Sequence, residues 1–145
     1  MKKSIIIILI LLLIVSTAVC LYVYNINKTE SYAEKNNKEY EKFYDQEILG
    51  TTLISIINKA TNDNEKNDVK KQEDTIYYID NNKNSVQITI KFLDSDKIIK
   101  MEEISQKQTE NFVQVFATAT FKCTQIQYHE KTKCIKSMYF EQIKN

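Results

Sequence analysis

The chain of 145 residues carries 20 basic and 19 acidic side chains, interspersed along its length, with no proline, no tryptophan and one glycine. Because it has neither a basic stripe nor any arginine to contact phosphates, we expect no nucleic-acid partner. A phosphate-cradling loop is also excluded, since such a loop needs several glycines. The many Lys, Asn and Ile residues are typical of an AT-rich bacterial genome.

Residues 5–24 form an almost unbroken apolar run preceded by Lys2 and Lys3. A helix of this length rises about 30 Å, the hydrocarbon thickness of a bilayer. The two lysines favour a cytoplasmic N-terminus, and tyrosines at the end of the run suit the membrane–water interface. We therefore predict that residues 1–24 are an uncleaved signal anchor, a single-pass transmembrane helix in the cell membrane, with the lipid bilayer as partner of residues 5–24.

Two alternatives for this segment remain open. Residues 17–19 look like a lipobox ahead of Cys20, which would make Cys20 the lipid-bearing residue of a lipoprotein, although the pattern has Gly, Ala or Ser where Val19 stands. A cut after Ala18 would instead make the segment a cleaved secretory signal. All three interpretations place residues 25–145 outside the cytoplasm.

A polar stretch follows the apolar run. Residues 25–47 are rich in Asn, Lys and Glu, and Tyr40, Phe43 and Tyr44 lie three and four apart, on one face of a helix. We predict a partly helical juxtamembrane stalk whose aromatic face packs on an extracytoplasmic domain formed by residues 48–145. That domain is long enough for one hydrophobic core.

The first element predicted in this domain is a helix after Gly50, with Thr51 as its cap. Its buried face has apolar side chains at i, i+3, i+4 and i+7, namely Leu53, Ile56, Ile57 and Ala60. Residues 62–74 are rich in Asn and charge and should form a solvated loop. A strand is predicted at residues 75–79.

Apolar and polar residues alternate over residues 86–92, which is the clearest strand signal in the chain. A short strand is predicted within residues 98–104. Ser105 should begin a helix, with Gln108 as the second half of a capping box and an apolar side at Phe112, Val113, Val115 and Phe116.

Two strands close the domain, one beginning at Ala117 and one covering residues 134–140, with a turn at residues 130–133. The apolar positions of the first strand change parity, which predicts a bulge near Thr124 or Gln125. The expected fold class is α+β, with a small antiparallel sheet of about four to five strands and helices packed on one face.

Cys123 and Cys134 are candidates for a disulfide, because their paired strands would lie outside the reducing cytoplasm. The predicted turn, however, places Cys134 opposite His129 and leaves Cys123 several residues away, so two buried free thiols are the alternative. Together with His129 the cysteines lack the close ligand pair of structural zinc sites. We expect His129 to be a solvated turn residue.

No other pattern indicates chemistry. Oxygen ligands for calcium occur at Asp63, Asn64, Glu65 and Asp68, but the turn glycine and the closing glutamate of a calcium loop are missing. The chain has no Gly-x-Ser-x-Gly elbow. We therefore expect no catalytic residue, no metal, no cofactor and no enzymatic activity.

A short basic start, one long apolar helix and a small α+β head resemble the architecture of type IV pilins and pseudopilins, over the first third of the chain. The resemblance implies a pilin-like assembly subunit. Pilins are cut after a glycine ahead of the apolar helix and carry a glutamate five residues into it, whereas Ser4 and Ile5 begin this run and no acidic residue lies within it.

Elimination leaves one main hypothesis for the function. We expect a non-catalytic interaction or accessory subunit of the bacterial cell envelope, with another envelope protein as its partner. The alternatives are a cysteine-dependent thiol activity or ligand binding on the hairpin of residues 121–140, and the pilin-like subunit.

Overall fold

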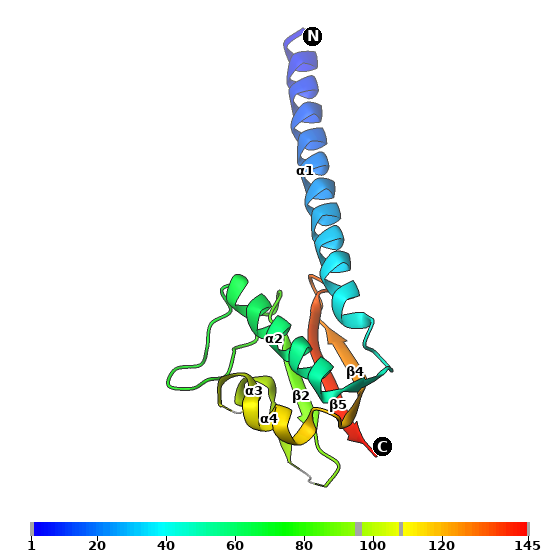
Figure 1. Cartoon of the computed structure of the whole chain (residues 1–145). Helices are drawn as coiled ribbons and strands as arrows, with labels where there is room; N and C mark the ends of the chain where they lie inside the picture. The colour runs from blue at the N-terminus through cyan, green and yellow to red at the C-terminus, as the bar shows by residue number, and fades with distance from the viewer. Residues whose placement is uncertain (1, 95–96, 108, 145) are drawn as a thin grey trace. The chain divides into compact units, whose positions relative to one another are not determined.

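The computed structural model describes residues 2–94, 97–107 and 109–144 and divides the chain into two compact units, residues 1–32 and 33–145. The first unit consists of helix α1 (Lys2–Glu41) up to Tyr32 (Figure 1). Large apolar side chains of residues 5–24 are about half exposed or more, from 48% at Val23 to 68% at Tyr22. Within the described residues, α1 is the one helix that is long and apolar enough to cross a membrane.

The second unit, which we call the head, begins inside α1 at Ala33, whereas the sequence placed the start of the folded domain at residue 48. Ala33, Asn37 and Tyr40 are buried, and their spacing of four and three puts them on one face of the helix. Phe43 also packs on the core, as predicted, whereas Tyr44 is half exposed. The last turns of α1 are therefore part of the head.

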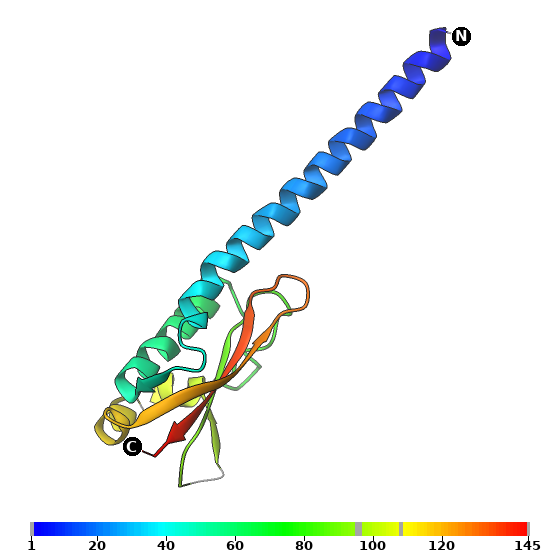
Figure 2. The same ribbon diagram turned by 90° about the vertical axis from the view of Figure 1, so that its right-hand side faces the viewer.

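A five-stranded sheet forms the centre of the head (Figures 1 and 2). Its strands lie in the order β1 (Glu47–Leu49), β4 (Thr120–Tyr128), β5 (Ile135–Ile143), β2 (Gln87–Lys91) and β3 (Ile98–Lys100). The expectation of an antiparallel sheet was wrong in one pair, because β2 and β5 are parallel. Side-chain alternation does not encode strand direction, and the long β2–β5 connection permits the parallel arrangement.

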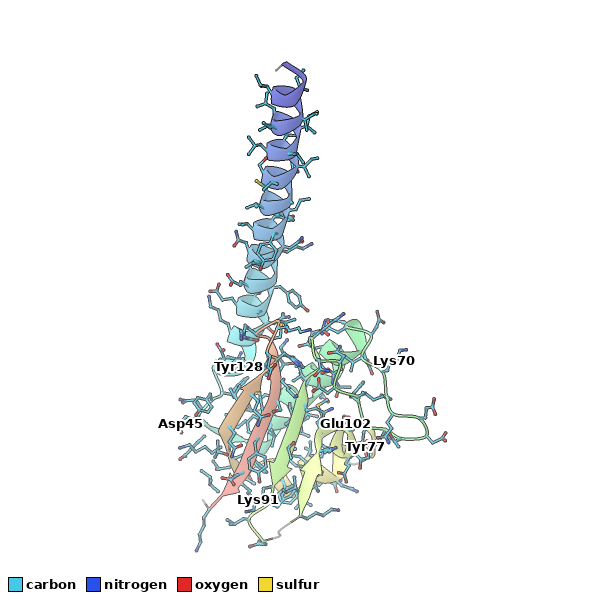
Figure 3. All side chains as sticks on the ribbon, turned by 180° about the vertical axis from the view of Figure 1, so that it is seen from behind. Asp45, Lys70, Tyr77, Lys91, Glu102 and Tyr128 are labelled. Atoms are coloured by element: carbon cyan, nitrogen blue, oxygen red, sulfur yellow. The ribbon has the colours of Figure 1, made fainter. Side chains whose placement is uncertain are left out.

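Helices α2 (Gly50–Lys66), α3 (Met101–Lys107) and α4 (Thr109–Phe116) cover one face of this sheet. In the described part of the chain, the opposite face carries no helix, as the view from behind shows (Figure 3). The head is therefore an α+β domain with helices on one side, as predicted. The core between the layers is fully buried at Leu53, Ile57, Ile88, Ile90, Phe121 and Phe140.

Gly50 is the first residue of α2 and lies against the end of α4. A Cβ atom at this position would stand 1.9 Å from the carbonyl oxygen of Phe116, so no other residue fits without moving the backbone. The N-cap is Leu49, which has no side-chain cap hydrogen bond, and the prediction of Thr51 as the cap was wrong. The lone glycine serves close helix packing.

Three predicted boundaries also differ from the structure. Helix α2 continues to Lys66, through residues that the sequence placed in a solvated loop. Residues 75–79 form no strand, and only an isolated bridge joins Lys71 and Tyr78. Helix α3 begins at Met101 rather than at Ser105. At this start, the carboxylate of Glu103 accepts a hydrogen bond from the N–H of Lys100 at 3.2 Å. Gln108, the predicted second half of the capping box, lies outside the described residues.

The two strand patterns with the strongest periodicity were confirmed. Ile88 and Ile90 of β2 are buried, with Gln87, Thr89 and Lys91 alternating between them. The register of β4 against β5 shifts between Cys123 and Gln125, where a bulge was predicted. A second shift occurs at Tyr128.

We expect Ile90→Asp to unfold the head, because it places a charge without a partner in the fully buried centre of the sheet. The free energy of unfolding should fall by about 4 kcal/mol or more. Thr89→Asp is the matched control, since Thr89 is only half-buried and lies opposite Lys100 in the register. Circular dichroism melting curves of both variants provide the measurement; a folded Ile90→Asp head would contradict the assigned core.

Candidate functional site

The three cysteines are all free thiols. Cys20 is exposed on α1, whereas Cys123 and Cys134 are buried in the head. Cys123 lies opposite Phe140 in the β4–β5 register, and Cys134 precedes Phe140 by about 20 Å of extended chain. A disulfide needs Cα atoms within about 7 Å, so the structure corresponds to the buried free thiols and not to the Cys123–Cys134 bridge.

Burial also determines the chemistry of Cys123. It raises the pKa of the thiol to about 11, against the opposing effect of backbone hydrogen bonds at Gln125 and Tyr139. The nucleophile in cysteine chemistry is the thiolate, which Cys123 does not form at neutral pH. A thiol activity based on this residue is therefore disfavoured.

His129 is 2% exposed, and the expectation of a solvated turn residue was wrong. Its Nε2 atom lies 2.8 Å from the carbonyl oxygen of Ser85. Since a carbonyl oxygen only accepts hydrogen bonds, Nε2 is the donor. Cys134 and His129 are neighbours through their backbones, with the His129 N–H donating to the Cys134 carbonyl oxygen at 2.8 Å. The imidazole holds the residue 80–85 loop against the β4–β5 turn.

Asp80 lies beside this histidine but forms its ion pair with Lys136. Lys136 Nζ is 2.6 Å from the Asp80 carboxylate, and His129 Nδ1 is 3.8 Å away, beyond hydrogen-bond distance. Burial alone would raise the pKa of Asp80, but hydrogen bonds from Lys136, the N–H of Asn82 and the Ser85 hydroxyl outweigh it and hold the pKa below its usual value. The carboxylate thus acts as an anchor of the loop.

Two further buried side chains hold the irregular segment of residues 67–86. Asn64 accepts the N–H of Val86 at 2.7 Å and donates to its carbonyl oxygen at 2.8 Å. Glu102 Oε1 accepts the N–H of Tyr78 at 3.0 Å and the side-chain amide of Gln87 at 3.2 Å. The segment is thus bound by side chains in place of the strand pairing that the sequence suggested.

The candidate metal ligands do not converge. Among residues 2–94, 97–107 and 109–144, no group of three or more His, Cys, Asp or Glu side chains is placed to hold a metal ion. Asp63 accepts hydrogen bonds from the Tyr40 hydroxyl at 2.7 Å and from Lys59 at 3.0 Å, and Asn64 is buried as described above. These side chains connect α2 to α1 and to the loop.

An apolar pocket of about 370 Å³ opens between α4 and the ends of β2, β3 and β5. Its apolar lining comes from Phe92, Ile99, Ile104, Phe112, Val115 and Phe116. Polar side chains also line it, namely Asp94, Lys97, Asn111 and Gln142. A concave, mainly apolar site with few polar groups is the usual form of a ligand-binding pocket, so we take this pocket as the candidate functional site.

Phenylalanine rings build the wall of the pocket. The Phe92 centroid lies 4.7 Å from that of Phe116, and Phe112 and Phe116 are 5.2 Å apart, both pairs tilted. Phe121, at the fully buried end of this cluster, stacks on Phe112 at 5.9 Å. Rings that contact one another in this way are held in place before any ligand arrives.

The surroundings of the pocket are apolar as well. Val115 is 68% exposed at the pocket, and Leu93, which follows the lining residue Phe92, is about half exposed. Gln142 Oε1 accepts the N–H of Leu93 at 3.2 Å, which fixes the amide at the pocket. Exposed apolar side chains grouped around a cavity are typical of an interaction site.

The pocket lies at the end of the head opposite the entry of α1. Asn37 contacts the β4–β5 turn beside Ile135, where β5 begins, whereas Gln142 stands near its other end, about 23 Å along the strand. Figure 3 labels Tyr128 and Lys91, which mark these two ends of the sheet. The lining of the pocket therefore lies far from the point at which the chain enters the head.

A second, polar hollow of about 690 Å³ lies at the β4–β5 turn, within the 121–140 hairpin proposed from sequence. Among its lining residues, Lys136 is paired with Asp80 and His129 with Ser85. Both side chains thus already have partners within the head. The apolar pocket is the better candidate.

Sequence reasoning missed the apolar pocket. It assigned Phe112, Val115 and Phe116 to the apolar side of a helix and Phe92 to a strand, each as core. One local signal was available, namely that Phe92 ends the alternating segment of residues 86–92 just before the polar turn that begins at Asp94. The cavity itself could not be predicted, because it depends on how α4 and the ends of the strands pack together.

A comparison of the chain with protein-family models, with curated proteins and with solved structures finds no match.

We expect Cys123 to resist alkylation by iodoacetamide in the folded full-length protein and to react after unfolding. Because its pKa is about 11, only about one folded thiol in a hundred is ionised even at pH about 9, so at each pH from about 7 to about 9 the folded thiol should react far more slowly than the unfolded thiol. Mass spectrometry of the peptide containing residue 123 gives both rates. Rapid labelling of the folded protein at Cys123 would favour a thiol function.

Proposed function

We propose that this protein is a membrane-anchored extracytoplasmic binding module, a non-catalytic interaction or accessory subunit of the cell envelope. The observation that carries the proposal is the combination of an exposed apolar helix with a folded head that has a preformed apolar pocket at its far end. The helix supplies the location and the pocket supplies the binding surface.

The anchor is supported by the length and composition of residues 5–24. This segment is helical throughout, covers about 30 Å and exposes its large apolar side chains, which in water would cost free energy in proportion to their area. Ser16 and Thr17 donate to carbonyl oxygens three residues earlier, at 2.9 and 2.8 Å. Their hydroxyls are thereby satisfied inside the helix, as a lipid environment requires.

The orientation follows from charge. Lys2 and Lys3 precede the apolar run and belong on the cytoplasmic side, so the head lies outside the cell. Tyr22 and Tyr24 then stand at the outer interface. The polar residues 25–32 separate this interface from the head, which begins at Ala33.

The binding role is supported by what the polar side chains of the head do. Three side chains of the head would be candidates for catalysis by residue type or burial, namely His129, Asp80 and Glu102. Each of them instead forms a hydrogen bond with the segment of residues 67–86. The lining of the apolar pocket, by contrast, consists mainly of phenylalanine and aliphatic side chains, with Asn111, Gln142 and one charged side chain of each sign, a composition that favours binding.

We expect the full-length protein, expressed in a Gram-positive host, to stay in the membrane after an alkaline carbonate wash. Its mass should correspond to a chain that retains residues 5–24, because an apolar helix is held by hydrophobic burial and not by charge. External protease applied to protoplasts should remove the head. Mass spectrometry and a C-terminal tag provide the readout.

Cys20→Ala is the matched variant for this test, and a transmembrane anchor should tolerate it. A lipid adduct that disappears in Cys20→Ala would identify a lipoprotein, and a soluble chain beginning after Ala18 would identify a cleaved signal. A head that intact protoplasts protect from protease would overturn the extracytoplasmic location.

A further inference from the structure

We infer that the apolar pocket binds an uncharged, extended segment of a partner polypeptide and takes one aromatic or large aliphatic side chain of that segment. The inference deepens the proposed function and rests on it, since it names the partner chemistry of the same pocket.

The size and lining of the pocket favour a single side chain. Its volume of about 370 Å³ is near the lower end of the range for ligand sites. Phe92, Phe112 and Phe116 already contact one another at tilted angles, so an inserted ring can add offset or edge contacts to them. A buried apolar anchor of this kind is how protein interfaces concentrate their binding energy.

The polar groups of the pocket fit a peptide backbone. Asn111 and Gln142 each carry a donor and an acceptor, as a peptide group does. The head itself uses this pairing, since the amide of Asn64 bonds both the N–H and the carbonyl oxygen of Val86. A fatty acid or another free acyl chain would offer no partner to the Asn111 amide or to the NH2 group of Gln142, at a cost in affinity.

Charge complementarity points to an uncharged segment. The charged side chains at the pocket are Asp94 and Lys97, one of each sign, so neither an anionic nor a cationic ligand is favoured as a class. The exposed apolar side chains of Leu93 and Val115 extend the apolar surface at the cavity. A polypeptide can cover them with the residues on either side of its anchor.

The neighbouring strand offers backbone partners as well. β3 is the last strand of the sheet, and no strand in the described part of the chain pairs with its outer edge. The Lys100 N–H points to that edge, where Glu103 accepts it, and backbone groups two residues apart share a direction, so those of Ile98 face outward too. An extended segment beside Ile98 would place alternate side chains on the side of Ile99, which lines the pocket.

The test uses the full-length protein in nanodiscs of phosphatidylcholine and phosphatidylglycerol, so that no detergent enters the pocket. The probe is the capped peptide acetyl-Ser-Gln-Trp-Gln-Ser-amide, with Phe, Leu, Ala and Glu versions of its central residue. Because the chain has no tryptophan, the probe reports its own burial by a blue shift of its emission. We expect saturable binding of the Trp peptide, displacement by the Phe and Leu peptides, and none by the Ala and Glu peptides.

Variants of α4 locate the binding. Val115→Glu should weaken the affinity about tenfold or more, because it places a charge at the pocket, and at 68% exposure it should not disturb folding. Val113→Glu, on the same helix but not lining the pocket, is the matched control and should retain the affinity. Asn111→Ala and Gln114→Ala form a second pair, of which only the first should weaken binding.

Three outcomes would overturn the inference. Binding of none of the Trp, Phe and Leu peptides by the folded protein would exclude a side-chain pocket. If decanoate binds more tightly than the peptides, the pocket is a site for free acyl chains. If Val113→Glu and Val115→Glu lose affinity for the Trp peptide equally, the peptide does not bind in this pocket. The carbonate and protease results do not depend on the pocket, so a failure here is distinguishable from a failure of membrane anchoring.

Discussion

Asn37 satisfies two backbone groups of the β4–β5 hairpin at once, and the organisation of the head depends on this contact. Its amide donates to the carbonyl oxygen of Lys133 at 2.8 Å and its oxygen accepts the N–H of Ile135 at 2.9 Å. One helical turn later, Tyr40 is 2% exposed and its hydroxyl donates to Asp63 of α2. Buried backbone groups without partners are costly, so these contacts make the last turns of α1 a structural part of the head and not a stalk below it.

The same type of contact recurs where the chain lacks regular structure. The long segment after α2 is held by hydrogen bonds from side chains outside it. Asn64 bonds the backbone of Val86, Glu102 that of Tyr78, and His129 that of Ser85. These buried polar side chains therefore stabilise the fold, and those near the hairpin turn hold that end of the head together. The apolar pocket lies at the other end, where phenylalanines meet and apolar side chains remain exposed. The polar contacts of the hairpin end and the pocket that we propose for binding thus lie at opposite ends of one small sheet.

The sequence predicted those elements whose burial is one-sided. Leu53, Ile56, Ile57 and Ala60 gave the face of α2, and alternation gave β2, because the sheet and helix periods report which side is buried. The burial of Asn64 could not be predicted, since its sequence context is that of a solvated loop while its partner lies 22 residues further on. Strand direction, the boundary at Ala33 and the pocket at Phe116 depend on contacts between distant segments, which no local pattern contains.

Hydrogen exchange of the full-length protein in nanodiscs, read segment by segment, tests most directly the claim that the head begins at Ala33. The account predicts that the amides of residues 33–41 are protected as strongly as those of the head and lose protection together with them when denaturant is added. Residues 25–32, of which 25–28 and 30–32 have exposed side chains, should exchange sooner. If residues 33–41 exchange as fast as residues 25–32 while the sheet remains protected, the contacts of Asn37 and Tyr40 do not join α1 to the head, and the account is contradicted.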